Sequence, residues 1–132
     1  MITSPYDKYR QSSVQTSTPG QLLLMMYDGA IRFVKGGLDA LKEQDFQKAN
    51  TFLNKTQTIV SELIVTLDHS FEVSKGLASL YEYINHLLIQ ANVKKEAAPA
   101  EEALGYLVEL RETWAQAAKM ATAEGAGNAS NG

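Results

Sequence analysis

Apolar residues recur at intervals of three and four along four long segments of this chain, with polar residues between them. This spacing places the apolar side chains on one face of an α-helix, and no segment shows the strict alternation of a strand. The prolines, at positions 5, 19 and 99, each stand where a helix can begin, because proline is tolerated in the first helical turn. The pattern predicts an all-α protein.

The ends of the predicted helices carry recognisable signals. Thr18 is a suitable N-cap, and Gln21, three positions later, can complete a capping box. Asp45 can cap the second helix, and acidic residues suit the first turn of the fourth. Helices are therefore predicted over residues 19 to about 44, 46 to about 67, 73–95 and 99 to about 121.

Four amphipathic helices joined by short connections favour an antiparallel up-down four-helix bundle over residues 19–121. Residues 1–18 are predicted to form a short N-terminal helical or extended cap. Residues 122–132 are small and polar and are predicted to be a disordered tail, because they cannot bury enough surface to become ordered. Inside the first helix, Gly29, Gly36 and Gly37 each cost about 0.5–1 kcal/mol relative to alanine, so we expect another backbone to approach them closely.

The start of the first long helix carries more apolar residues than a bundle requires. Residues 22–27 are apolar or aromatic without a break, whereas a bundle helix needs about three apolar positions in seven. Part of this turn therefore needs a cover, and the tyrosine-bearing leader is the nearest candidate. The leader is either permanent packing or a cover over a groove for a partner's apolar helix or extended segment, to which adaptable methionines are suited. The candidate residues of cover and groove are Tyr6, Tyr9, Val14, Leu22, Met25, Met26 and Tyr27.

Polar residues also lie within or beside the apolar stripes of the second and third helices, namely Asn54, Gln57, Thr58, Asn85 and Asn92. A buried amide costs free energy unless it is hydrogen-bonded. These side chains either bond internally and fix the helix register, or bond the backbone of a bound peptide. Along the third helix, the candidate peptide contacts are Tyr81, Asn85, Leu88 and Asn92.

Composition narrows the class of partner. The 132 residues carry a net charge of −3 with scattered basic residues, which argues against nucleic acid or an anionic membrane as the main partner. No cysteine is present, the first residues lack the basic and then apolar pattern of a signal peptide, and no apolar run is long enough to span a membrane. We expect a soluble, cytoplasmic protein without an integral membrane segment.

Catalytic chemistry finds little support. The two histidines are His69, in a predicted loop, and His86, one turn after Glu82. Helical-bundle metal centres use Glu-x-x-His pairs, and the sequence contains none. Serines and threonines lack a histidine in motif spacing, and no glycine-rich phosphate loop follows a strand. We expect no enzymatic activity, no cofactor and no metal; a metal- or cofactor-bearing bundle enzyme is the rival prediction.

Several segments of the chain match, in order, those of one known protein family. The opening matches are Pro5-Tyr6 with Tyr9, Val14-Gln15-Thr16, Thr18-Pro19-Gly20-Gln21-Leu22 and Met25-Met26-Tyr27-Asp28-Gly29. Further matches are Ala49-Asn50, the segment 55–63, Leu67-Asp68, the segments 80–83 and 88–92, and Leu110-Arg111-Glu112-Thr113-Trp114. In these segments the chain resembles the flagellar secretion chaperone FliS family, and the resemblance covers roughly residues 4 to 118.

The resemblance implies a cytoplasmic, non-enzymatic chaperone that binds the C-terminal segment of flagellin. It further implies that the chaperone prevents premature polymerisation and delivers flagellin to the flagellar type III export gate. In that family the N-terminal leader lies over part of the binding surface and flagellin displaces it. We expect a monomer or a weak homodimer. The alternative is a purely structural or self-associating bundle whose N-terminal segment is fixed core.

Overall fold

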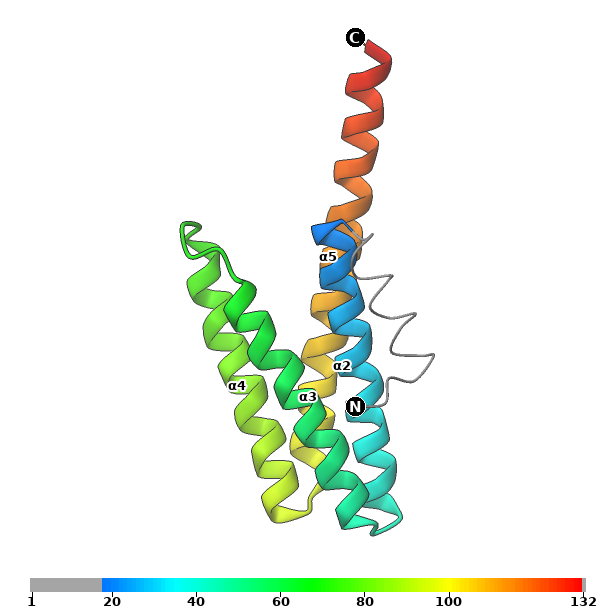
Figure 1. Cartoon of the computed structure of the whole chain (residues 1–132), viewed down its shortest axis with the longest axis vertical. Helices are drawn as coiled ribbons and strands as arrows, with labels where there is room; N and C mark the ends of the chain where they lie inside the picture. The colour runs from blue at the N-terminus through cyan, green and yellow to red at the C-terminus, as the bar shows by residue number, and fades with distance from the viewer. Residues whose placement is uncertain (1–17, 132) are drawn as a thin grey trace, which may run out of the picture.

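A computed structural model describes residues 18–131 of the chain, with side-chain surroundings as far as residue 120. Its helices are α2 (Pro19–Lys42), α3 (Phe46–Thr66), α4 (Val73–Lys94) and α5 (Ala97–Asn131). They run alternately down and up, so that neighbours in the chain are antiparallel (Figure 1). The predicted all-α up-down four-helix bundle is confirmed.

The predicted helix starts are close to the observed ones. Thr18 and Gln21 form the reciprocal capping box, with the backbone N–H of Gln21 donating to Thr18 Oγ1 at 3.2 Å and that of Thr18 donating to Gln21 Oε1 at 3.0 Å. Asp45 caps α3 by accepting from the backbone N–H of Lys48. The predicted end of the first helix at Gln44 is two residues late. Gln44 adopts a left-handed conformation with φ of 60°, which ends the helix.

The last helix differs more from its prediction. It begins at Ala97, so Pro99 lies inside its first turn and does not open it. It continues to Asn131, through residues whose composition predicts a disordered tail, and this end projects beyond the other three helices (Figure 1). The division into cap, bundle and tail stays a prediction.

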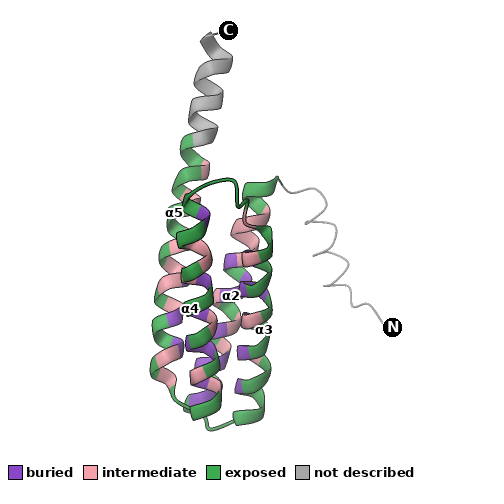
Figure 2. Cartoon of the chain, turned by 90° about the vertical axis from the view of Figure 1, so that its left-hand side faces the viewer, coloured by how far each residue is buried: buried purple, intermediate pink, exposed green. Residues whose placement is uncertain are grey.

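The four helices form a ring in which each packs against its two neighbours, α2 against α3 and α5, and α4 against α3 and α5. Buried residues line the inner faces along the length of the bundle (Figure 2). The largest fully buried side chains are Tyr27, Tyr81, Leu53, Leu63, Ile84, Leu88, Leu107, Val34, Val60 and Thr56. Thr56, which interrupts the apolar stripe of α3, satisfies its hydroxyl by donating to the Phe52 carbonyl.

Gly29, Gly36 and Gly37 of α2 face side chains of α3, not another backbone as the sequence predicts. A Cβ at Gly37 would lie 3.0 Å from Leu53 Cδ2, and one at Gly36 would lie 3.2 Å from the Phe52 ring. A Cβ at Gly29 would lie 3.4 Å from Ile59 Cδ1. These contacts let α3 pack tightly along α2.

At the end where α2 begins, the α3–α4 pair leans away from the α2–α5 pair (Figure 1). This end, called here the open end of the bundle, also holds the α3–α4 connection and the α5 residues around Trp114. Leu23, Leu63, Leu77 and Trp114, one from each helix, line a cavity there. The predicted groove residues at the start of α2 therefore lie at the less tightly closed end of the fold.

Candidate functional site

The unbroken apolar turn of α2 lies at the open end. Its residues Leu22, Leu23, Leu24, Met25 and Met26 are all half-buried, so none of them belongs to the fully buried core. Gly29 lies against Ile59 of α3, and the two helices are antiparallel. The apolar turn is therefore level with residues 62–66 of α3. This turn is a surface feature of the bundle, as its pattern predicts.

Tyr27, predicted as part of the groove, is instead fully buried, and so is Tyr81. Their hydroxyls form a hydrogen bond across the bundle from α2 to α4. The indole N–H of Trp114 on α5 donates to Tyr27 Oη at 3.1 Å. These three side chains tie together three helices just below the open end. In this conformation neither tyrosine ring is available to a partner at the surface.

Burial raises the pKa of Tyr27 and the pKa of Tyr81 above the ordinary phenol value, because a phenolate is poorly solvated in the core. The bond to Tyr81 raises the pKa of Tyr27 further, whereas the same bond lowers the pKa of Tyr81. The cluster stays neutral at physiological pH.

The other candidate residues of α4 lie either in the core or at the seam, the line of contact between α3 and α4. Leu88 is fully buried, so it supports the bundle from inside. Asn85 Nδ2 donates to Ser61 Oγ at 3.1 Å, and Asn92 Nδ2 donates to Asn50 Oδ1 at 2.7 Å. Both amides therefore join α4 to α3, as the internal-bonding interpretation predicts. Asn85 Oδ1 is buried and has no hydrogen-bond partner in the described part of the chain.

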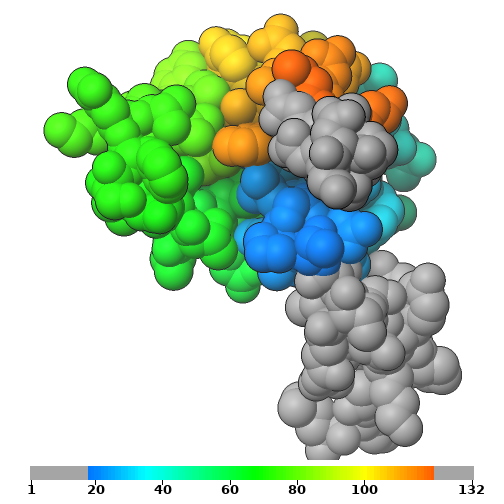
Figure 3. Space-filling model, turned by 90° about the horizontal axis from the view of Figure 1, so that it is seen from above, coloured from blue at the N-terminus to red at the C-terminus, as the bar shows by residue number. Residues whose placement is uncertain are grey.

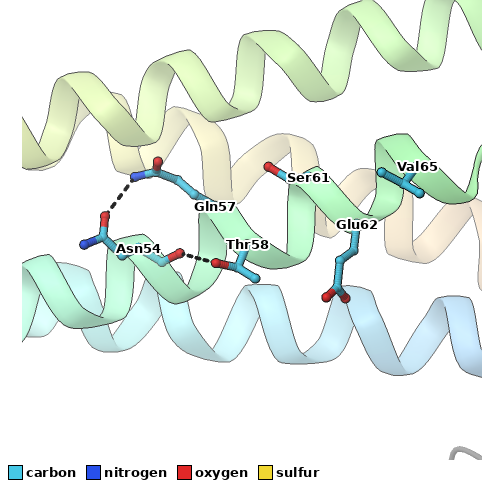
Figure 4. Close-up of a pocket in the computed structure, with 6 residues that line it drawn as sticks. All are labelled: Asn54, Gln57, Thr58, Ser61, Glu62 and Val65. Carbon is cyan, nitrogen blue, oxygen red and sulfur yellow. Dashed lines mark hydrogen bonds between the residues drawn. The ribbon is translucent and has the colours of Figure 1, made fainter.

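The outer face of α3 carries a shallow hollow beside this seam. Figure 4 shows its lining, with Gln57 and Ser61 directed toward α4 and Glu62 toward α2. Gln57 Nε2 lies 3.5 Å from Asn54 Oδ1, a long contact that leaves both amides able to bond elsewhere. The hollow is lined by Asn54, Gln57, Thr58, Ser61, Glu62 and Val65. It offers hydrogen-bond donors and acceptors along one helix face, next to the apolar turn of α2.

Sequence reasoning missed three exposed apolar side chains at the open end. Val65 is 81% exposed, Phe71 61% and Val73 68%. They surround the α3–α4 connection, and the helical period alone does not distinguish them from ordinary surface residues. It also missed Trp114 as a partner of the tyrosines, although the residue is the only tryptophan in the chain and could have drawn notice.

The remaining predicted residues give limited results. Tyr6, Tyr9 and Val14 lie outside the described residues. His86 is exposed and stacks on Tyr83, and within residues 18–131 no cluster of acidic, histidine or cysteine side chains could hold a metal. No helix in the described part of the chain is long and apolar enough to cross a membrane.

Comparison with known proteins gives a consistent result. The family described as flagellar protein FliS matches residues 2–121. The flagellar secretion chaperone FliS of Bacillus subtilis (strain 168) is 38% identical over 116 residues, covering 88% of this chain and 87% of the relative. The Campylobacter jejuni protein of the same name is 31% identical over 111 residues, covering 83% and 87%.

A solved structure supports the fold. The crystal structure titled as a flagellar chaperone from bacteria superposes with a TM-score of 0.72 at 20% identity, covering 87% of this chain and 98% of that one. The matched family region includes the apolar turn of α2, the buried tyrosines and the α3 hollow. On this evidence the chain belongs to the FliS family of flagellar proteins, whose relatives are named flagellar secretion chaperones.

Proposed function

We propose that this protein is a cytoplasmic, non-enzymatic export chaperone for flagellin. It binds the C-terminal segment of flagellin, prevents premature polymerisation and delivers the subunit to the flagellar type III export apparatus. The names of the relatives support the chaperone role. The observation that carries the flagellin-binding step is the half-buried turn of α2 beside the polar hollow of α3.

This pairing suits an amphipathic segment. Leu22, Met25 and Met26 offer apolar area to the apolar side of a bound helix. The amides and hydroxyls of the α3 hollow offer hydrogen bonds to backbone groups where the segment is extended. Methionine side chains adapt their shape to different apolar partners. A segment that folds on binding must recover its ordering cost, so a large wrapped surface is required.

Binding of this kind blocks polymerisation without a covalent step. In the proposed mechanism, the flagellin segment that would contact other subunits is buried on the chaperone while the complex lasts. Release requires only that another contact compete for the same segment, and no covalent bond forms or breaks. The buried Tyr27, Tyr81 and Leu88 then support the surface from beneath.

The N-terminal leader, residues 1–17, is the proposed cover of the apolar turn. Thr18, the first residue that the structure describes, caps the start of α2 at the open end, where the apolar turn lies. We propose that Tyr6, Tyr9 and Val14 cover this turn in the free protein and leave it when flagellin binds. The rival arrangement is a leader that is permanent core, in a bundle that is purely structural or self-associating.

Calorimetric titration with the C-terminal segment of the same organism's flagellin tests the function. We expect a one-to-one complex with a gain of helical circular dichroism. Met25→Glu should weaken binding at least tenfold, because a carboxylate would be buried against apolar area without a partner. Ser79→Glu adds the same charge on the exposed face of α4 and should leave affinity within twofold. No complex at micromolar concentration would refute the function.

Deletion of residues 1–17 tests the cover separately. If the leader is movable, the shortened chain stays folded, exposes apolar surface to a hydrophobic dye and binds the flagellin segment more tightly. Unfolding of the shortened chain would show that the leader is core. Sedimentation of the full chain at several concentrations distinguishes a monomer or weak homodimer from a self-associating bundle.

A further inference from the structure

The open end of the bundle contains an apolar cavity that the flagellin surface does not account for. Its volume is about 250 Å³. Figure 3 looks down on this end, where the α3–α4 connection (green) faces the start of α2 (blue) and α5 (orange). Tyr81 and Trp114 belong to the lining, together with Leu23, Leu63, Thr66, Leu67, Asp68, Phe71, Val73, Ser74 and Leu77. Dry apolar cavities of about 150 Å³ already accept a benzene ring, so this one can hold a larger aromatic group.

Hydrogen-bond direction leaves one unused donor in this cavity. Trp114 Nε1–H donates to Tyr27 Oη, and one of the two tyrosines donates to the other. Either hydroxyl can donate in this pair, and in both arrangements one tyrosine O–H is left without an acceptor. Only Tyr81 lines the cavity, so a group bound there can accept from an O–H left over on Tyr81 but not from one left over on Tyr27. A bound acceptor therefore favours the arrangement in which Tyr27 donates to Tyr81. The Tyr81 O–H then has no acceptor among the described residues and is free to point into the cavity that Tyr81 lines.

The other polar groups of the lining already have hydrogen-bond partners. Thr66 Oγ1 donates to the Leu63 carbonyl at 2.9 Å. Ser74 Oγ donates to the Asp68 carbonyl, and the Asp68 carboxylate accepts from Ser70 at the exposed rim. Tyr81, which is 1% exposed, thus supplies a single unused donor in otherwise apolar surroundings.

We propose that this cavity binds a tyrosine side chain of the export substrate, whose ring lies among the apolar lining residues and whose phenol oxygen accepts from the Tyr81 O–H. The source of the phenol rests on the proposed function. The cavity lies beside the proposed flagellin surface, since Leu23 of its lining follows Leu22 in α2, and Thr66 follows Val65 of the α3 hollow.

A phenol fits better than the other common side chains. Leucine or phenylalanine would fill the volume but leave the Tyr81 O–H buried without an acceptor, which is unfavourable. A charged side chain would lose its hydration with no opposite charge inside the cavity. The phenol supplies an apolar ring, edge-to-face contact with Trp114 and Phe71, and one oxygen acceptor.

Two small probes test the chemistry without flagellin. p-Cresol reproduces the tyrosine side chain and toluene the phenylalanine side chain. Each is titrated into the full chain while the indole N–H resonance of Trp114, the sole tryptophan, reports occupancy by NMR. We expect p-cresol to bind about fivefold more tightly than toluene, the ratio that one net hydrogen bond supplies.

Tyr81→Phe should abolish this preference and leave toluene affinity unchanged, which also shows that the cavity is intact. Tyr106→Phe, a change outside the cavity lining, is the matched control and should keep the preference.

The outcomes separate the alternatives. Equal affinities for the two probes in the natural chain, or a preference that survives Tyr81→Phe, would overturn the proposal. If p-cresol binds only after Tyr6 and Tyr9 are both changed to phenylalanine, the leader occupies the cavity and a substrate phenol is excluded.

The source is tested by competition. We expect the C-terminal flagellin segment to displace p-cresol, and a segment that binds without displacing it would overturn the proposal. If the segment does not bind at all, the proposed function is refuted, and so is flagellin as the source of the phenol. If p-cresol still binds more tightly than toluene in that experiment, the cavity's preference for a phenol stands and only its source is wrong.

Discussion

Replacing glycines by alanine, one at a time, tests how closely α3 packs on α2. In a helix that has room for a Cβ, glycine to alanine stabilises by about 0.5–1 kcal/mol. At Gly76 and Gly105, no neighbouring atom outside the local helix backbone lies within 4 Å of an added Cβ. These positions should show the full gain and serve as matched controls.

The α2 positions should fall below that gain in the order of their contacts. At Gly29 the contact with Ile59 is 3.4 Å, an ordinary van der Waals distance, so most of the gain should remain. At Gly36 the half-buried Phe52 ring must shift, and the net effect should be near zero. At Gly37 the fully buried Leu53 lies 3.0 Å away, and overpacking costs about 1–3 kcal/mol.

The expected net result for Gly37→Ala lies between no change and about 2.5 kcal/mol of destabilisation, once the helix gain is subtracted. Urea unfolding followed by circular dichroism at 222 nm measures the free energy of unfolding of each variant. A Gly37→Ala chain stabilised as much as Gly105→Ala would refute the close contact between α2 and α3.

Three further predictions concern the core, the tyrosine pair and the cap of α2. Leu88→Ala should lower the unfolding free energy by about 2–5 kcal/mol in urea titrations, whereas Ile89→Ala, at a neighbouring position that is 47% exposed, should cost less than about 1 kcal/mol. Folding raises the pKa of Tyr27 and of Tyr81 above 10.0, so the contribution of these protonated phenols to stability is complete below pH 10 and is lost as the pH rises beyond it. The fall in urea midpoint from pH 8 to pH 11 should therefore be smaller for Tyr27→Phe than for the natural chain. An equal fall in the two proteins would contradict this account. Thr18→Ala should lower the thermal midpoint by removing an N-cap worth about 1 kcal/mol, whereas Thr51→Ala, inside α3, should not lower it.

Much of the fold followed from local signals. The capping box at Thr18 and the cap at Asp45 mark helix starts because each satisfies backbone N–H groups that the helix leaves unpaired. The 3.6-residue period then assigned most core residues, since only one face of each helix can be buried in a bundle. The end of α2 was less predictable, because the left-handed turn at Gln44 has no strong sequence signal.

The candidate site was predictable only in part. The unbroken apolar run marked the start of α2 as unusual, and the structure finds Leu22, Met25 and Met26 half-buried. The same run could not show that Tyr27 points inward, because its direction depends on how α2 is rotated against α4 and α5. Asn85 and Asn92 could be read either way until their partners on α3 were known.

The sequence by itself determined the number of helices, their approximate ends, the excess of apolar residues at the start of α2 and the family. These properties depend on residues close together in the chain, or on their order along it. Only the tertiary structure decided which polar side chains are paired, which tyrosines are core, and that a cavity lies between the helices at the open end. Those properties depend on groups as far apart in the chain as Tyr27 and Trp114, whose distance is set by the packing of whole helices.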